Sequence, residues 1–207
     1  MKKFLTENSG PIIKFLSNHI VMSILGIMVG LAILSAEGNV DGMSSLALVG
    51  GLFCVGFLCF LQYDGMFFFG SKDGIKARAD GKKPRYFKGA LVSLVAYSPV
   101  ILTVVALIIA QLIERGGQEN VSGVLLFLFY AIQGSYISFY SLIGKLGPSL
   151  FAVITLIPSF VAATLGYIMG ALDMPIRKLL GFNIKPPYDG PVERRRDYRE
   201  QGGSDKE

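Results

Sequence analysis

Residues 46–69 read LALVGGLFCVGFLCFLQYDGMFFF, an apolar stretch whose one charged residue is Asp64. The stretch exceeds the ~20 residues that an α-helix needs to cross the hydrocarbon core of a bilayer. Backbone N–H and C=O groups surrounded by lipid must pair within their own segment, and a helix achieves this. An outer-membrane barrel would instead show short segments of alternating polarity. The stretch therefore predicts a membrane-spanning helix.

Three further apolar blocks of spanning length flank this stretch, at residues 16–36, 90–113 and 148–172. Of the 207 residues, 52% are apolar and 17% are charged, and the mean hydropathy is +0.52. Soluble globular domains carry about 25% charged residues, enough to cover their surface. The composition excludes a soluble domain, a disordered chain and a disulfide scaffold. It predicts an all-α integral membrane protein.

A fifth apolar segment, residues 124–143, decides how often the chain crosses the membrane. Its middle carries the polar sequence Gln133-Gly134-Ser135. Lys and Arg favour cytoplasmic loops. Five crossings would put 11 of the 20 basic residues on one side of the membrane and 9 on the other. If the segment instead returns to the side from which it entered, 18 of the 20 lie on the cytoplasmic side. The sequence predicts four spanning helices plus one re-entrant or surface-lying apolar segment, with five spanning helices as the alternative.

The same charge distribution predicts the division of the chain. We expect an N-terminal cytoplasmic tail at residues 1–15 and a polytopic helical membrane domain at 16–172. Within that domain, residues 70–89 would form a basic cytoplasmic loop, and residues 173–207 a basic, largely disordered cytoplasmic tail. The predicted location is the plasma membrane of a bacterium, with several crossings and both termini in the cytoplasm. A poor cleavage site after the first block predicts that this helix is retained.

Small residues recur at every fourth position in the first and last predicted helices. They are Gly26 and Gly30 in the first, and Ala162, Gly166 and Gly170 in the last. This spacing puts them on one helix face and lets a second backbone approach closely. One interpretation is contact with a second copy or a larger membrane protein. The other is that these two helices pack against each other within one chain.

Pro99 and Pro158 lie inside two of the predicted spanning helices. A proline in a helix removes one backbone hydrogen bond and clashes with the preceding turn, so each predicts a kink. In transporters, interrupted helices expose backbone groups that bind substrate near the middle of the membrane. Pro99, Pro158 and Gln133 are therefore the residues of a candidate substrate path.

Two basic clusters belong to the predicted cytoplasmic face. Lys82, Lys83 and Arg85 lie in the loop, and Arg194, Arg195 and Arg196 lie in the C-terminal tail. Each basic residue near an anionic membrane surface contributes about 1 kcal/mol to binding. Because the basic residues flank apolar segments, no groove-sized basic face for nucleic acid is expected. The expected contacts are anionic lipid headgroups or an acidic protein.

Residues 73–78, DGIKAR, resemble the D-G-x-x-A-R part of the motif of CDP-alcohol phosphatidyltransferases. The resemblance implies carboxylates that hold two metal ions and activate an alcohol. That family has three further aspartates, at the positions occupied here by Gly70, Ser93 and Tyr97. With those acids absent, we expect no such catalysis. The two cysteines and the single histidine lack a ligand spacing, so no metal or other cofactor is expected.

Together these features predict a non-enzymatic accessory or scaffolding subunit of a membrane complex. Its partners would be the lipid bilayer with its anionic headgroups and either a second copy or a larger membrane protein. A small transporter or channel using Pro99, Gln133 and Pro158 is the alternative. A lipid-head-group enzyme, based on residues 73–78 alone, is the third alternative.

Overall fold

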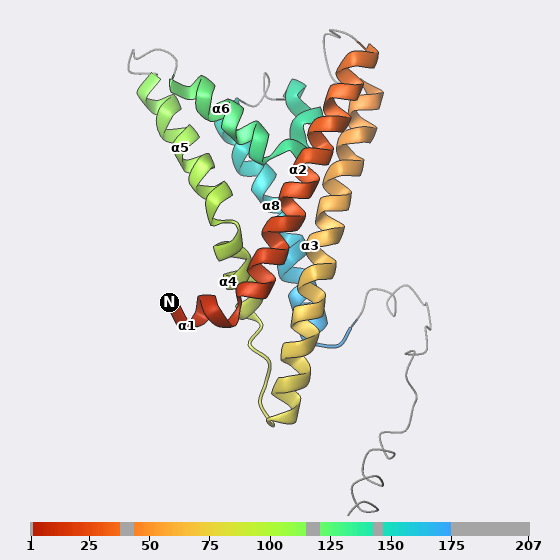
Figure 1. Ribbon diagram of the computed structural model, residues 1–207, viewed down its shortest axis with the longest axis vertical. Helices are drawn as coiled ribbons and strands as arrows, with labels where there is room; N and C mark the ends of the chain where they lie inside the picture. The colour runs from red at the N-terminus through yellow and green to blue at the C-terminus, as the bar shows by residue number, and fades with distance from the viewer. Residues whose placement is uncertain (1, 38–43, 115–120, 143–146, 175–207) are drawn as a thin grey trace, which may run out of the picture. The chain divides into compact units, whose positions relative to one another are not determined.

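The computed structural model describes residues 2–37, 44–114, 121–142 and 147–174, and every regular element within them is helical (Figure 1). Three of these helices, α2, α3 and α8, are long and apolar enough to cross a membrane, and the bent pair α4–α5 makes a fourth candidate. The predicted all-α class is confirmed. The elements are α1 Lys2–Glu7, α2 Ser9–Glu37, α3 Ser45–Ala79, α4 Phe87–Ala96, α5 Ser98–Glu114, α6 Val121–Ile132, the 3₁₀-helix η1 Gly134–Leu142 and α8 Pro148–Ala171.

Helix α2 begins at Ser9, well before the predicted start at residue 16. Pro11 lies in its first turn, where a missing N–H breaks no helical bond. The short helix α1 joins it through Asn8, whose backbone N–H and side-chain amide both donate to the carbonyl of Phe4, at 3.1 and 2.8 Å. Most of the segment expected to be a tail is therefore helical.

Helix α3 runs from Ser45 to Ala79, ten residues beyond the predicted apolar stretch. Ser44 caps its start by accepting a hydrogen bond of 2.9 Å from the backbone N–H of Ala47. Lys76 and Arg78 lie in the last turn, where the helix dipole favours cations. The expectation of a loop over 70–89 was thus wrong for its first half, and the residues between α3 and α4 are limited to 80–86.

Four glycines explain why α3 continues so far, because they let it pack backbone against backbone on α8. A Cβ on Gly70 would overlap the carbonyl oxygen of Tyr167, and one on Gly170 would overlap that of Phe67. Gly74 and Gly166 make equivalent close approaches to Ala171 and Tyr63. Gly166 and Gly170 of the predicted packing face therefore contact α3 rather than the first helix.

The small residues of the first helix contact a different element. A Cβ on Gly26 would overlap the backbone of Gly134, and one on Gly30 would overlap the side chain of Ile137. Both glycines therefore pack against η1. The interpretation that the first and last helices pack on each other through these residues is wrong, because each ridge is occupied by another part of the same chain.

The third predicted span is divided at Tyr97, where α4 and α5 meet at a bend of 60°. Pro99 lies two residues later, so the predicted kink is confirmed. Side chains satisfy nearby carbonyls: Ser98 donates to Val95 at 2.7 Å and Thr103 donates to Pro99 at 2.9 Å. Pro158 has a different outcome, since α8 continues without a break from Pro148 to Ala171.

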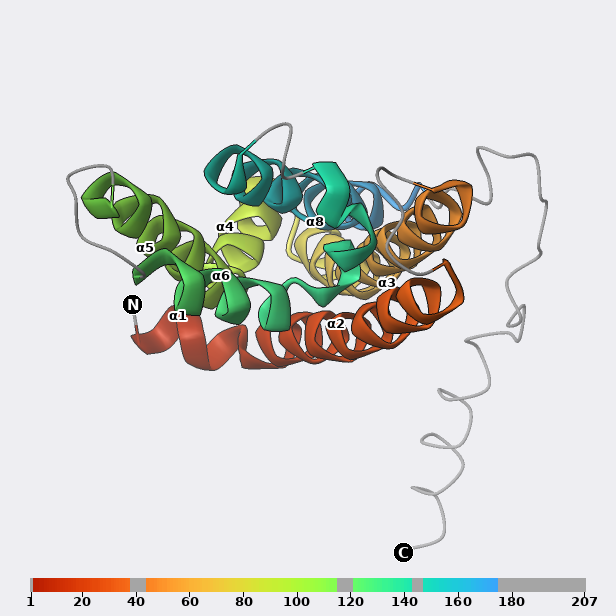
Figure 2. The same cartoon turned by 90° about the horizontal axis from the view of Figure 1, so that it is seen from above.

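The chain reverses at Gln133, between α6 and η1. Along η1, Gly134 lies against the middle of α2, Ile137 lies one turn further along α2, and Phe139 lies against Gly51 near the start of α3. Figure 1 shows α6 descending into the bundle and η1 rising again. Seen from above in Figure 2, the chain leaves α6 beside α2 and turns inward. The predicted position of the turn is confirmed.

Two buried apolar clusters fill the interior. One includes Phe15, Val92 and Ala163 and lies toward the ends of the helices where α4 begins. The other includes Met22 and Phe129 and lies toward α6 and η1. Between the two clusters, α2 and α8 carry the buried polar residues His19 and Ser159, which belong to the site described next.

Candidate functional site

Polar side chains lie buried between the two apolar clusters. On α2, His19 falls between Phe15 and Met22; on α8, Ser159 falls between Ala152 and Ala163. Tyr97 occupies the junction of α4 and α5, and the reversal at Gln133 adds four consecutive buried residues. We call the following set the polar layer: His19, Tyr97, Gln133, Ser135, Tyr136 and Ser159.

The polar layer forms where the interrupted segments meet. The hydroxyl of Tyr97, at the α4–α5 break, faces the side chains of Gln133 and Ser159. Tyr136 of η1 also faces Ser159. Ser159 directly follows Pro158 and Tyr97 closely precedes Pro99. The structure thus brings together the three sequence neighbourhoods that were predicted as a substrate path.

His19 of α2 is buried inside the bundle. Its ring packs edge-on against Tyr97, with 5.2 Å between centroids and an interplanar angle of 70°. It also faces the carbonyl of Ile132, which accepts a hydrogen bond from the hydroxyl of Ser23. That carbonyl ends α6 and has lost its helical partner. Ser23 therefore compensates for the break at Gln133.

None of the side-chain polar atoms of this layer makes a hydrogen bond of normal geometry with another described residue, although the hydroxyls of Tyr97 and Tyr136 face Ser159. Gln133 and Ser159 are both 0% exposed. Leaving a buried donor or acceptor unpaired costs about 1–3 kcal/mol. None of the six side chains is a carboxylate, an ammonium or a guanidinium. They offer hydroxyl, amide and imidazole groups, which suit an uncharged polar molecule that both donates and accepts hydrogen bonds.

Thr155 provides a contrast one turn earlier on α8. It is also buried, but its hydroxyl donates to the carbonyl of Ala152 at 2.8 Å within the same helix. Gln62 of α3 is satisfied as well, by a bond of 3.2 Å from its amide to the carbonyl of Phe15. Buried polar residues elsewhere in the interior can therefore find partners, and the polar layer differs from them.

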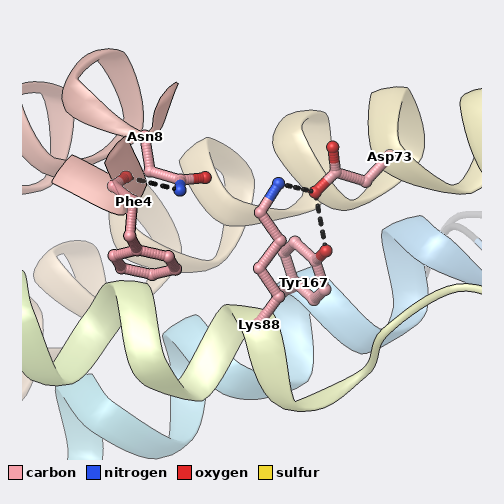
Figure 3. A network of polar contacts seen from close by, with 5 residues as sticks. All are labelled: Phe4, Asn8, Asp73, Lys88 and Tyr167. Atoms are coloured by element: carbon pink, nitrogen blue, oxygen red, sulfur yellow. Dashed lines mark hydrogen bonds and ion pairs between the residues drawn. The ribbon is translucent and has the colours of Figure 1, made fainter. Parts of the chain in front are cut away.

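A second polar site lies near the starts of α2 and α4. Asp73 of α3 accepts two bonds at Oδ2, one of 2.6 Å from the ammonium of Lys88 on α4 and one of 2.7 Å from the hydroxyl of Tyr167 on α8 (Figure 3). The three residues tie three helices together. The ion pair is about one-third exposed, with 31% for Lys88 and 32% for Asp73, so its contribution to stability is small.

A cavity of about 110 Å³ adjoins this ion pair. Charged and polar side chains from α1, α3 and α4 line it together with an apolar wall. Its lining residues are Glu7, Asn8, Pro11, Met66, Phe69, Lys72, Asp73, Lys88, Val92 and Tyr167.

The remaining residues predicted from the sequence are the two basic clusters and the stretch 73–78. Lys82, Lys83 and Arg85 are exposed in the segment between α3 and α4. Arg194, Arg195 and Arg196 lie outside the described residues. The stretch 73–78 is part of α3, where Arg78 donates to the carbonyl of Ala171 at 3.3 Å. It serves the packing of α3 on α8.

Sequence reasoning missed most of the polar layer and the Asp73–Lys88–Tyr167 contact. A usable signal existed for Ser159, which directly follows Pro158, and for Tyr97, which lies two residues before Pro99. None existed for the Asp73–Lys88–Tyr167 contact, because its members are brought together by helix packing.

Within the residues that the structure describes, no three His, Cys, Asp or Glu side chains are grouped to hold a metal ion. The chain was compared with protein-family models, with curated proteins and with solved structures, and no match was found in any of the three comparisons.

Proposed function

We propose that this chain is a small membrane transport protein, a transporter or channel, whose solute path passes through the polar layer. The observation that carries the proposal is the meeting of two interrupted segments around six buried polar side chains that make no hydrogen bond of normal geometry. Interrupted helices in transporters form binding sites near the middle of the membrane. Polar groups at that depth are costly and mark pathways for substrates.

The membrane placement that goes with this proposal has four crossings, made by α2, α3, the α4–α5 pair and α8. The segment formed by α6 and η1 enters the membrane and returns. Two features support it: α6 is too short to cross alone, and the backbone around Gln133 is covered by protein, as non-helical backbone at membrane depth requires.

The proposed orientation follows from the basic residues. With the α3–α4 connection in the cytoplasm of a bacterial cell, the exposed Lys82, Lys83 and Arg85 lie where positive charge is favoured. Anionic headgroups of the inner leaflet would attract them. Both termini are then cytoplasmic, because the start of α2 and the end of α8 lie at the same end of the helices as this connection (Figure 1).

The depth of the polar layer agrees with a transport role. Gly166 of α8 packs against Tyr63 of α3, beside the exposed Asp64. Ser159 is about two helical turns from that level, toward the start of α8. A span that ends near Asp64 therefore places Ser159 close to the middle of the hydrocarbon. Apolar side chains close the layer on both sides in this structure.

The solute class follows from the chemistry of the layer. Hydroxyl, amide and imidazole groups replace the water that a polar solute loses on entering the membrane. Without a charged side chain in the layer, an ion gains no compensating charge there. We therefore expect small uncharged polar molecules, such as polyols or amides.

A flux measurement tests the proposal. The full chain is reconstituted in liposomes, and entry of glycerol and urea is followed by light scattering after an osmotic step. We expect faster entry than in empty liposomes, and a loss of about fivefold or more in Tyr97→Phe and Ser159→Ala, since one hydrogen bond contributes about 1 kcal/mol.

Thr155→Val is the matched control for these variants, because its hydroxyl is buried on the same helix but bonded to backbone. It should leave the flux unchanged. Absence of flux in the unmodified protein, or an equal loss in all three variants, would contradict a path through the polar layer.

The second candidate is the accessory or scaffolding subunit, and one feature favours it. Phe53, Phe57 and Phe60 form an exposed ladder on α3, with ring centroids 6.0 and 6.2 Å apart. Such a face can pack against a helix of another membrane protein or a second copy. A defined complex that is stable in native membranes and lost in Phe57→Ala, in a protein without flux, would support this candidate.

A further inference from the structure

We propose that the cavity beside Asp73 and Lys88 binds the headgroup of a zwitterionic phospholipid with a primary ammonium, of the ethanolamine class. The inference does not depend on transport through the polar layer, because it rests on different residues near the starts of α2 and α4. It assigns a lipid-binding site to a chain whose other features suggest only general contact with the bilayer.

The charges that line the cavity are balanced. Two lysines, Lys72 and Lys88, and two carboxylates, Glu7 and Asp73, face one small volume. A ligand with a net negative charge would meet both carboxylates, and a net cation would meet both lysines. A ligand that carries one charge of each sign complements the cavity as a whole.

Two of these charges are available to a ligand. Asp73 and Lys88 pair with each other, and theirs is the one ion pair found among the side chains that the structure describes. Lys72 instead places its ammonium over the ring of Phe68, 4.4 Å from the centroid. That contact uses one face of the ammonium and leaves N–H donors free for a phosphate. Glu7 remains available to accept from the ligand's ammonium.

Asn8 adds a neutral acceptor to the carboxylate side of the cavity. Its amide nitrogen donates to the carbonyl of Phe4 at 2.8 Å, which fixes the side-chain orientation. The amide oxygen then points toward the side of Lys88 and Asp73 (Figure 3). A primary ammonium has three N–H donors for Glu7, Asn8 and the second oxygen of Asp73. A choline group has none, so the lining favours ethanolamine.

The surroundings favour a lipid over a soluble zwitterion. Pro11, Met66, Phe69 and Val92 give the cavity an apolar wall. Phe68, against which Lys72 packs, is 53% exposed and precedes Lys72 on α3, on the membrane side of the cavity. The volume of about 110 Å³ holds part of a headgroup, so the acyl chains would lie outside the cavity along Phe68.

The position along the helices also suits a headgroup. Lys72 and Asp73 lie about two turns beyond Asp64 on α3, so the cavity lies outside the hydrocarbon core, on the cytoplasmic side of the proposed span. Lys88 lies at the start of α4, and Tyr167 lies near the end of α8.

Native mass spectrometry of the full chain, stripped of lipid and titrated with pure lipids, tests the inference. The probes are phosphatidylethanolamine, phosphatidylcholine and phosphatidylglycerol with identical acyl chains, and glycerophosphoethanolamine as the chain-free headgroup. We expect phosphatidylethanolamine to bind at least tenfold more tightly than the other three. Glu7→Gln should remove the preference over phosphatidylcholine, and Lys72→Gln should weaken the binding of phosphatidylethanolamine by removing the phosphate contact.

Lys76→Gln is the matched control, because Lys76 is exposed one turn further along α3 and does not line the cavity. It should retain the preference. As a second readout, phosphatidylethanolamine should raise the thermal unfolding midpoint of the unmodified protein and of Lys76→Gln, but not of Lys72→Gln.

Each other outcome overturns the inference in a distinct way. Equal binding of the three lipids shows general contact only. Tighter binding of phosphatidylglycerol shows an anionic-lipid site. Equal binding of glycerophosphoethanolamine shows a site for a soluble zwitterion. None of these results changes the flux expected through the polar layer, so the two proposals fail separately.

Discussion

Ser159 and Thr155 are buried hydroxyl residues one turn apart on α8, yet the structure gives them different roles. The Thr155 hydroxyl is bonded to the carbonyl of Ala152, whereas the Ser159 hydroxyl faces those of Tyr97 and Tyr136 and makes no hydrogen bond of normal geometry. A buried polar side chain that only stabilises the fold is expected to form its hydrogen bonds within the protein, whereas one that binds a ligand can leave them open. This difference is what assigns Ser159, and not Thr155, to the proposed solute path.

Stability measurements on two variants test that separation. Ser159→Ala removes an unsatisfied buried hydroxyl, so the free energy of unfolding should stay the same or rise by up to about 1 kcal/mol. Thr155→Val removes a hydroxyl that is bonded, so the free energy of unfolding should fall or stay the same. Reversible unfolding in mixed detergent–SDS micelles, followed by circular dichroism, supplies both values.

Far-ultraviolet spectra of both folded variants should match that of the unmodified protein. A loss of more than about 1 kcal/mol in Ser159→Ala would show that its hydroxyl supports the fold, which would remove the contrast on which its assignment to the solute path depends.

At the residue scale, the sequence could identify breaks but not the groups that meet at them. Pro99 and Gln133 were recognisable because proline and a Gln-Gly-Ser run interrupt an apolar segment. Tyr136 and His19 were not, because the direction of a side chain on a membrane helix depends on its neighbours. Asp73, Lys88 and Tyr167 are far apart in sequence, and only the packing of three helices joins them.

At the scale of elements, glycines set the distance between helices. Gly70 and Gly170 each receive the backbone of the facing helix, and a methyl group at either position would overlap a carbonyl oxygen. Hydrophobic burial does not drive association of helices in lipid, so close backbone packing has to hold α3 and α8 together. Gly70 and Gly74 on α3 have the same four-residue spacing as the small residues of the last helix. The sequence could not show that these two glycines pack against α8, and the structure does.

Gly170→Ala should therefore destabilise the protein, by about 1–3 kcal/mol, the range for overpacked sites. Gly56→Ala is the matched control on α3, because a Cβ there would meet no atom within 4 Å. It should leave stability unchanged or raise it by up to about 1 kcal/mol through helix propensity. Unfolding in SDS-containing micelles measures both. Equal effects would mean that the α3–α8 contact is not close.

The length of a helix could be predicted from the sequence only where the thickness of the membrane sets it. Apolar length gave the existence and approximate limits of α3 and α8, because a helix must span the hydrocarbon. It could not give the last ten residues of α3, whose side chains are mostly polar or charged and whose helical state depends on packing against α8. It also could not show that Pro158 leaves α8 continuous while the chain breaks at Tyr97.

At the scale of the whole membrane domain, topology rests on the segment from Val121 to Leu142. The positive charges argued that this segment does not cross, and the contacts of η1 with α2 and with the start of α3 support a return to the side of entry. A polar layer lined by the reversal at Gln133 needs that arrangement. If the segment crossed instead, its turn would not face Tyr97 and Ser159.

Labelling of single cysteines tests the arrangement directly. With Cys54 and Cys59 changed to Ala, we expect Gln118→Cys and Leu146→Cys to react with a membrane-impermeant maleimide added to whole cells. Lys82→Cys should react only after the cells are permeabilised. Because Gln118 and Leu146 lie on either side of the segment in sequence, their common accessibility means that the chain between them does not cross. Opposite accessibility would establish a fifth crossing, which would put the two chain ends on opposite sides of the membrane. It would also contradict the proposed solute path, because that path requires the chain to turn back at Gln133.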